Sequence, residues 1–195
     1  SQEKMVKYLD IPVQHGSNSV LARMNRDVTR EQIQQVVAKV RERVPGVAIR
    51  TSVMVGFPGE TDEEFRDLLS FVEEQKFTHL GCFSYSREEG TVAGRMDDQV
   101  DEDVKRERLD QVMQKQREIS AQALQDYVGK VVPVLVQGQS TETELLWQGR
   151  LSTQAPEVDG VVYINDGEPK AGEIQFVEIT ESHDYDLVGH IVEMH

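Results

Sequence analysis

The chain has 195 residues, of which 38% are hydrophobic and 29% are charged, and its formal net charge is −14. This size and composition fit a soluble globular protein of one or two domains. No apolar run approaches the length of a membrane span, and no signal peptide is visible at the start of the sequence. The negative charge argues against a nucleic-acid backbone as the main partner, because polyanions bind lysine and arginine. A single cysteine, Cys82, excludes an internal disulfide, so we expect a reducing cytoplasm.

The first part of the chain alternates short apolar runs with amphipathic segments. The runs 6–13, 47–55 and 78–86 are predicted to be strands, and helices are predicted from Thr29 to Val44 and from Thr61 to Gln75. Each helix should begin with a capping box, because a threonine is followed three residues later by Gln or Glu. The expected buried face of the first helix comprises Ile33, Val36, Val37, Val40 and Val44. This order predicts parallel strands joined by helical crossovers, either in a small open sheet or in the C-terminal piece of a longer barrel.

The pattern changes after a long helix predicted over 101–127. Five short apolar segments separated by turn residues follow, at 131–138, 145–151, 160–166, 173–181 and 187–193. They predict a small antiparallel β-barrel, so we divide the chain into domains 1–127 and 128–195. The second domain holds three basic and twelve acidic residues, for a net charge of −9, against 18 basic and 23 acidic residues, or −5, in the first.

Three predicted strand ends carry glycine and polar residues. They are QHGS at 14–17, GFPGET at 56–61 and YSREEGT at 85–91. In parallel α/β proteins ligands bind at the carboxyl ends of strands, and glycine lets the backbone approach them closely. The turn at 56–60 is therefore either an adenine cradle or a stiffened connection between strand and helix.

Two further side chains in this region have alternative interpretations. His15 either acts as a base or ligand contact, or it bonds to a backbone carbonyl. Arg50 lies within an apolar strand, where an unpaired charge would be unfavourable. It therefore faces a polar site or pairs with a carboxylate such as Asp10.

Several long stretches resemble the radical S-adenosylmethionine methylthiotransferases. They include YLDIPVQHGS (8–17), AIRTSVMVGFPGETDEEF (48–65) and LGCFSYSREEGT (80–91). The likeness is strongest to the RimO-type enzymes, which methylthiolate an aspartate of the twelfth small-subunit ribosomal protein, whereas MiaB-type relatives modify an adenosine in transfer RNA. The resemblance implies an α/β fold: the C-terminal half of a radical SAM (β/α) barrel, followed by a TRAM domain, a small OB-like antiparallel β-barrel that docks the substrate.

The resemblance also implies a cofactor site. S-adenosylmethionine is expected to contact Gln14, His15, Ser17, Arg50, Gly56, Phe57, Pro58, Gly59, Glu60 and Tyr85. The family's iron–sulfur clusters are held by a CxxxCxxC triad and three further cysteines, none of which is present here. We therefore expect a fragment without catalytic or metal-binding residues, inactive alone, of a parent enzyme that performs radical chemistry.

The charge of the second domain bears on the substrate. An RNA-binding barrel should present lysine, arginine and stacking aromatics, whereas this one is strongly acidic. A basic ribosomal protein is therefore the expected partner, and transfer RNA is not. The candidate docking residues, at predicted turns, are Glu157, Asp159, Asp184 and Asp186. The alternatives are a transfer RNA methylthiotransferase, a non-catalytic acidic binding module, and acidity that serves solubility alone.

Overall fold

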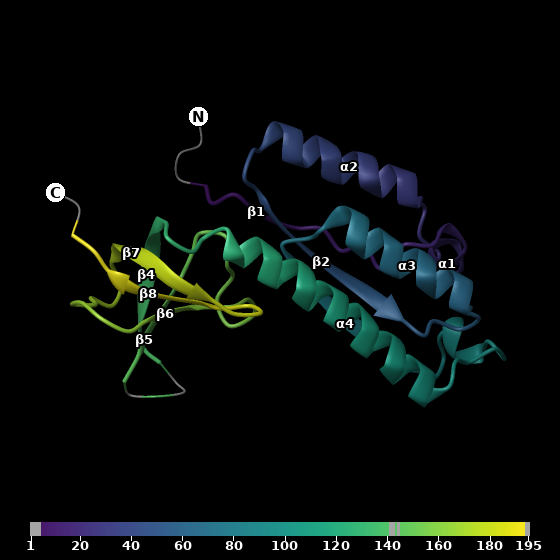
Figure 1. Ribbon diagram of the computed structural model, residues 1–195. Helices are drawn as coiled ribbons and strands as arrows, with labels where there is room; N and C mark the ends of the chain where they lie inside the picture. The colour runs from purple at the N-terminus through teal and green to yellow at the C-terminus, as the bar shows by residue number, and fades with distance from the viewer. Residues whose placement is uncertain (1–4, 141–142, 144, 194–195) are drawn as a thin grey trace. The chain divides into compact units, whose positions relative to one another are not determined.

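The computed structural model describes residues 5–140, 143 and 145–193, which divide into two compact units (Figure 1). One unit is Leu9–Ile119, and the other joins residues up to Tyr8 with those from Ser120 onward. The end of the long helix, from Ser120 onward, is therefore grouped with the second unit because most of its contacts are made there.

The first unit is built on a three-stranded sheet in the order β1-β2-β3. The strands are β1 (Tyr8–Asp10), β2 (Ala48–Val55) and β3 (His79–Ser84). The helices are α1 (Asn18–Arg23), α2 (Arg30–Arg43), α3 (Asp62–Gln75) and α4 (Glu102–Gln125), with a 3₁₀ helix at Ala93–Arg95. Strands β2 and β3 pair in parallel, as predicted, and α2 and α3 run beside β2 in Figure 1.

The helix starts follow the sequence closely. Both capping boxes form: Thr29 with Gln32, and Thr61 with Glu64. The expected face of α2 was wrong at one position, because Val36 is 49% exposed. At about 100° per residue, position 36 falls at the edge of the apolar stripe. The six-residue helix α1 was not predicted. None of the helices in the described part of the chain has the length and apolar character needed to cross a bilayer.

One apolar core lies between β2 and the helices. Its buried members include Leu21, Ile33, Val37, Ile49, Val53, Val55, Phe65, Leu68, Phe71, Val72, Phe77 and Val112. Along β2 the odd-numbered residues 49–55 are buried, whereas Arg50, Ser52 and Met54 are half-buried. Since successive side chains of a strand point to opposite faces, Arg50 lies on the face that this core does not use.

The second unit contains a closed five-stranded barrel in the order β4-β5-β6-β8-β7. Its strands are β4 (Val131–Gln139), β5 (Trp147–Arg150), β6 (Val162–Ile164), β7 (Ile174–Ser182) and β8 (Leu187–Ile191). All five predicted strands are present, but the β6–β8 pairing is parallel rather than antiparallel. An odd number of strands cannot alternate in direction around a closed ring, so at least one parallel pair is required.

Candidate functional site

The three predicted strand ends lie side by side at one edge of the sheet. The backbone N–H of Met54 donates to the Gln14 carbonyl at 2.8 Å, which joins the end of β1 to β2. The N–H of Tyr85 donates to the Val55 carbonyl at 2.9 Å, which joins the end of β3 to β2. The structure thus brings the QHGS, GFPGE and Tyr85 segments together, as the parallel topology predicts.

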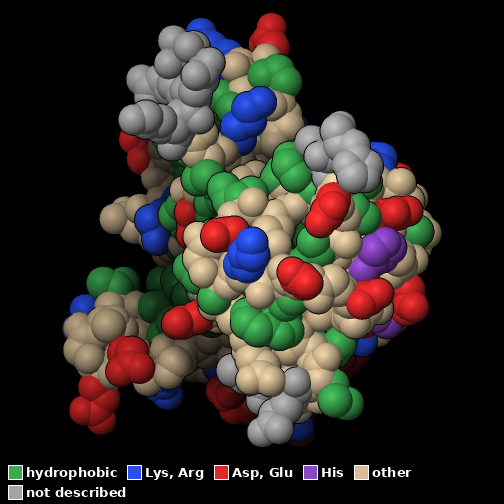
Figure 2. Space-filling model, turned by 90° about the vertical axis from the view of Figure 1, so that its left-hand side faces the viewer, with side chains coloured by type: hydrophobic (Ala, Val, Ile, Leu, Met, Phe, Trp, Pro, Cys, Tyr) green, Lys and Arg blue, Asp and Glu red, His purple; other side chains and the backbone are tan. Residues whose placement is uncertain are grey.

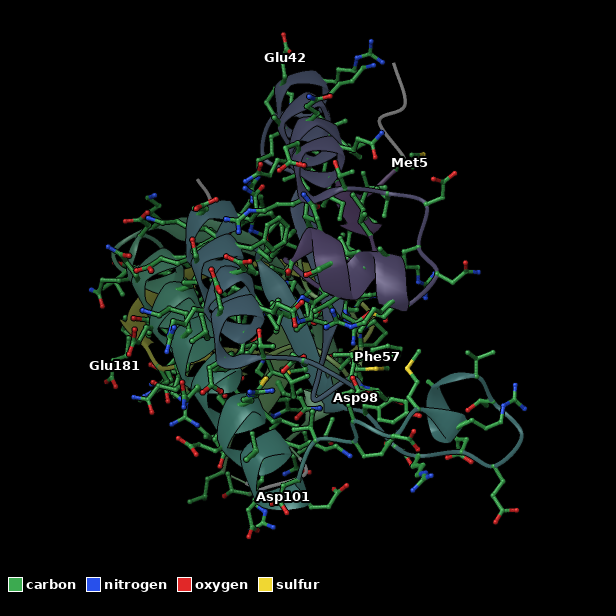
Figure 3. All side chains as sticks on the ribbon, turned by 90° about the vertical axis from the view of Figure 1, so that its right-hand side faces the viewer. Met5, Glu42, Phe57, Asp98, Asp101 and Glu181 are labelled. Carbon is green, nitrogen blue, oxygen red and sulfur yellow. The ribbon has the colours of Figure 1, made fainter. Side chains whose placement is uncertain are left out.

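The turn after β2 needs its glycines for two physical reasons. Gly56 and Gly59 have φ angles of +71° and +74°, which L-amino acids rarely adopt. A Cβ on Gly56 would also lie 2.3 Å from Cγ of Lys105, and one on Gly59 would overlap the Asp98 carboxylate. Figure 3 shows Phe57, in this turn, near Asp98. The turn is therefore packed tightly against its own chain.

A buried carboxylate, Glu60, holds the turn in place. Its side chain has no exposed surface, and its Oε2 accepts hydrogen bonds from the Gly56 N–H at 3.0 Å and from His15 Nε2 at 3.2 Å. Its Oε1 accepts from Arg108 Nη1 of α4 at 2.7 Å, and Arg108 Nη2 also donates to Asp62 at 2.7 Å. Because a buried charge requires a partner, the Glu60–Arg108 ion pair is necessary for this arrangement.

His15 is fixed in one tautomer by its neighbours. Its Nδ1 accepts a hydrogen bond from the Ser17 backbone N–H at 3.0 Å, so the ring proton lies on Nε2 and is donated to Glu60. The side chain has no exposed surface, and both ring nitrogens already have hydrogen-bond partners, so it has no free polar group to offer a ligand. His15 and Glu60 therefore fix the shape of the turn through their hydrogen bond to each other and through the bond from the Gly56 N–H to Glu60.

An aromatic pair lies beside the turn. The rings of Phe57 and Tyr85 meet edge to face with centroids 5.4 Å apart, and the Lys105 Nζ lies 5.4 Å from the Tyr85 centroid. Around them pack Val20, Met24, Met54, Ala93 and Met96. The Tyr85 hydroxyl is buried and has no hydrogen-bond partner within the described residues. A buried donor without a partner is unfavourable, so this hydroxyl is suited to bind a ligand group or a water molecule.

The remaining predicted cofactor residues differ in position. Ser17 is the N-cap residue of α1, and Gln14 is half-buried with a φ of +75°. Pro58 is buried within the turn. Arg50 pairs in register with His79 and precedes Gly56 by six residues, which is about 20 Å along a strand. The structure therefore does not bring Arg50 to the turn.

The four candidate docking residues of the barrel lie in two adjacent loops. The Val161 N–H donates to Asp186 Oδ1 at 2.8 Å, which joins the loops. Asp159 Oδ2 accepts from the Ala155 N–H and from the Tyr8 hydroxyl, both at 2.7 Å. Glu157 and Asp184 are exposed. Two of the four carboxylates thus stabilise the loops that carry the other two.

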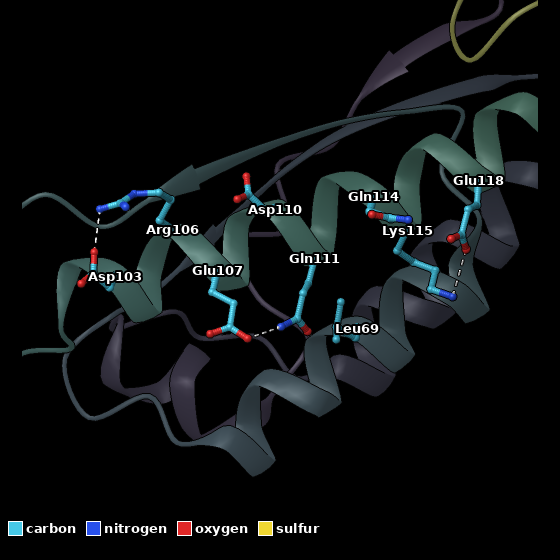
Figure 4. A pocket seen from close by; sticks show the side chains of 9 residues that line it. All are labelled: Leu69, Asp103, Arg106, Glu107, Asp110, Gln111, Gln114, Lys115 and Glu118. Carbon is cyan, nitrogen blue, oxygen red and sulfur yellow. Dashed lines mark hydrogen bonds and ion pairs between the residues drawn. The ribbon is translucent and has the colours of Figure 1, made fainter.

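A cavity of about 600 Å³ lies elsewhere in the first unit, between α3 and α4 (Figure 4). It is lined by Leu69 of α3 and by charged and amide side chains of α4, from Asp103 to Glu118. Within this lining, Gln111 donates to Glu107 at 3.1 Å and Lys115 donates to Glu118 at 3.4 Å. None of the predicted cofactor residues lines this cavity, and its polar groups largely pair with one another.

Arg23 of α1 ties the turn to the start of α3. Its guanidinium donates to the Gly59 carbonyl at 3.1 Å and to both oxygens of Glu64, at 2.9 Å and 2.7 Å. Hydrogen bonds to the Glu64 carboxylate, first from Arg23 and then from the Ser19 hydroxyl and the Thr61 N–H, lower its pKa from 4.5 to about 2. The ordinary pKa of the unfolded state lies above this value, so the pair stabilises the fold above pH 4.5.

We therefore expect the stabilisation by Glu64 to be lost as the pH falls from 4.5 to about 2. Glu64→Gln should be less stable than the wild type at pH 7, and the difference should shrink at pH 3. Urea unfolding of both proteins at the two pH values measures this. A difference that is independent of pH would contradict the role assigned to the Arg23–Glu64 pair.

The chain offers one cysteine as a thiolate ligand. Burial raises the pKa of the Cys82 thiol to about 12, which disfavours the thiolate that metals bind. Among residues 5–140, 143 and 145–193, no group of three or more His, Cys, Asp or Glu side chains is arranged to hold a metal ion. The described residues do not fit an iron–sulfur cluster.

Sequence reasoning missed the residues that approach the turn from other elements. Arg108 and Lys105 come from α4, and Arg23 comes from the unpredicted helix α1. The sequence of α4 does indicate that two of these residues are buried, because the spacing of Lys105, Arg108 and Val112 places them on one helix face. Charged side chains on a buried face require a partner.

Comparisons with known proteins match two separate stretches of the chain. Residues 2–72 match the model of the Radical SAM superfamily, and residues 128–192 match the TRAM domain. The ribosomal protein uS12 methylthiotransferase RimO of Bdellovibrio bacteriovorus is 50% identical over 97% of this chain and 41% of the relative. The enzyme of the same name from Geobacter sulfurreducens is 52% identical over 98% of this chain and 43% of the relative.

A solved structure gives only a distant likeness. Coproporphyrinogen III oxidase (HemN) from Escherichia coli, a radical SAM enzyme, aligns with a TM-score of 0.47 and 22% identity over 60% of this chain and 27% of its own. The chain spans about two-fifths of the length of the curated relatives it matches. The chain thus combines a match to the Radical SAM superfamily with a match to the TRAM domain, and about half of its residues are identical to those of the RimO enzymes over nearly its whole length.

Proposed function

We propose that this chain is part of an enzyme that methylthiolates an aspartate of ribosomal protein uS12. The main support for this proposal is that about 50% of the residues are identical to those of uS12 methylthiotransferases across nearly the whole chain. The three strand ends that meet at one edge of the sheet support it further, because ligands bind at such edges. The acidic barrel supports a basic protein partner over transfer RNA, because it repels phosphates.

The turn at 56–60 is the proposed seat of S-adenosylmethionine. Gly59 keeps part of its surface exposed, and the Tyr85 hydroxyl beside the turn has no partner among the described residues. Gln14 and Gly59, which keep some exposure, are placed to contact the ligand, whereas His15 and Glu60 hold the turn in shape. In this family S-adenosylmethionine supplies the radical that removes a hydrogen from the substrate. Arg50 remains a proposed contact only if the ligand extends along the sheet.

The iron–sulfur clusters that the family requires are not assigned to this chain. Its described residues hold one thiol, which is half-buried and has a raised pKa. We propose that the cysteine ligands lie in the part of the relatives' length that this chain does not span. In this proposal residues 1–127 form one side of the cofactor site, residues 128–195 dock the substrate, and the enzyme works in the cytoplasm.

The proposal predicts activity on uS12 and not on transfer RNA. The full-length parent with reconstituted clusters should add one methylthio group to an aspartate of purified uS12, detected by peptide mass spectrometry. Because the partner is expected to be basic, binding of uS12 should weaken as salt rises from 0.05 to 0.5 M on the order of tenfold. Modification of transfer RNA, or its micromolar binding at physiological salt, would contradict the proposal and favour a transfer RNA enzyme.

A further inference from the structure

Two buried polar atoms near the turn at 56–60 have no hydrogen-bond partner among the described residues. They are the Tyr85 hydroxyl and Oε1 of Gln99. The exposed surface gives no comparable signal on the face drawn in Figure 2, where acidic, basic and hydrophobic side chains are interspersed. A buried polar group normally has a partner, so each exception indicates a ligand or an ordered water molecule.

Gln99 is held beside the turn with its amide in one orientation. The Gly59 N–H donates to the Asp98 carbonyl at 2.8 Å, which joins the turn to the residue before Gln99. Nε2 of Gln99 donates to the carbonyls of Ala93 and Met96, both at 2.9 Å. Carbonyl oxygens only accept hydrogen bonds, so these two bonds identify the nitrogen end of the amide. Oε1 is therefore a fixed acceptor, and it points away from both carbonyls.

The neighbourhood of this acceptor is apolar and aromatic. Ala93 and Met96, whose carbonyls hold Gln99, pack on the edge-to-face pair of Phe57 and Tyr85. Aromatic and apolar walls with a few fixed polar groups are typical of a site for a flat ring. The Tyr85 hydroxyl and Gln99 Oε1 offer one donor and one acceptor to the edge of such a ring. This pattern matches a heteroaromatic amine, in which an N–H group lies next to a ring nitrogen.

We propose that Gln99 Oε1 accepts a hydrogen bond from the adenine amino group of S-adenosylmethionine, and that Gln99 thereby selects adenine over rings without that group. The inference rests on the proposed function and adds to it a specificity-determining residue that lies outside the three strand ends. In this arrangement the Tyr85 hydroxyl donates to the ring nitrogen beside the amino group. Both buried polar atoms then gain the partner that they lack among the described residues.

The test compares two ligands on the full-length parent with reconstituted clusters, by isothermal titration calorimetry. S-inosylmethionine carries a carbonyl oxygen where S-adenosylmethionine carries the amino group, so it would set an oxygen against Gln99 Oε1. The wild type should therefore bind it at least about tenfold more weakly. Gln99→Met keeps the side-chain length without the acceptor, and it should reduce this preference to less than about threefold. The matched control is Gln111→Met, the same substitution at an exposed side chain that bonds to Glu107 at 3.1 Å, and it should leave the preference unchanged.

The outcomes separate a ligand contact from a structural role. A wild type that binds the two ligands equally would overturn the inference, and this result does not depend on the folding of any variant. Equal weakening of both ligands by Gln99→Met, with the preference kept, would show that Gln99 only braces the segment 93–96 and would also overturn the inference. A wild type that binds neither ligand would instead refute the proposed function.

Discussion

Replacing Arg108 with methionine is expected to destabilise the first unit by about 3–5 kcal/mol. The variant keeps much of the side-chain length but leaves the Glu60 carboxylate buried without its cationic partner. Guanidinium unfolding of this chain measures the effect through two probes. Circular dichroism follows helices α1 to α4, whereas the fluorescence of Trp147, the one tryptophan, follows the barrel. The helical signal should shift to lower denaturant, and the tryptophan signal should not.

The chain supplies a matched control two residues away. Arg106 also forms an ion pair from α4, with Asp103 at 2.8 Å, but both side chains are exposed, at 69% and 84%. Arg106→Met should therefore change the stability by no more than about 0.5 kcal/mol. Adding Glu60→Gln to Arg108→Met should recover part of the loss, because it removes the unpaired charge. Equal effects of the two arginine variants would show that the buried pair is not needed.

Replacing Gly56 with alanine is expected to have the second large effect, about 3 kcal/mol in unfolding free energy. Two penalties add: the φ of +71° is strained for alanine, and the new methyl group would lie 2.3 Å from Cγ of the buried Lys105. The turn or α4 must therefore move. The same unfolding experiment measures the loss, and binding of S-adenosylmethionine to the full-length parent should weaken with it.

A variant at Gly46 separates the cost of backbone strain from the cost of steric overlap. Its φ is +78°, but nothing lies within 4 Å of the position of its Cβ. Gly46→Ala should therefore cost only the backbone strain, about 1–2 kcal/mol. If Gly46→Ala and Gly56→Ala destabilise equally, the contact between the turn and Lys105 has no energetic weight.

Much of the fold follows from local sequence patterns. Apolar runs and the two capping boxes predict β2, α2 and α3, because these elements are specified by residues close in sequence. The short α1 lacks enough turns to show a helical period, so it was missed. The parallel β6–β8 pair in the barrel follows from closure of five strands, which no single strand reveals.

The candidate site was predicted in outline and not in its contacts. The strand ends converge because parallel strands share one edge, which the element order implies. The roles of the side chains could not be read in the same way. His15 and Glu60 look like ligand contacts in the sequence, yet they bond to each other, and Glu60 also bonds to Arg108, 48 residues further along the chain. The place of Arg108 on the apolar face of α4 indicates that it is buried, but no periodic signal in the sequence identifies its partner.

The Glu60–Arg108 pair shapes the turn that we propose as the seat of S-adenosylmethionine. Equilibrium binding of S-adenosylmethionine to the reconstituted full-length parent tests it most directly. The account predicts at least about tenfold weaker binding for Arg108→Met than for Arg106→Met, under conditions where both variants remain folded. Equal affinities of the two variants would contradict it.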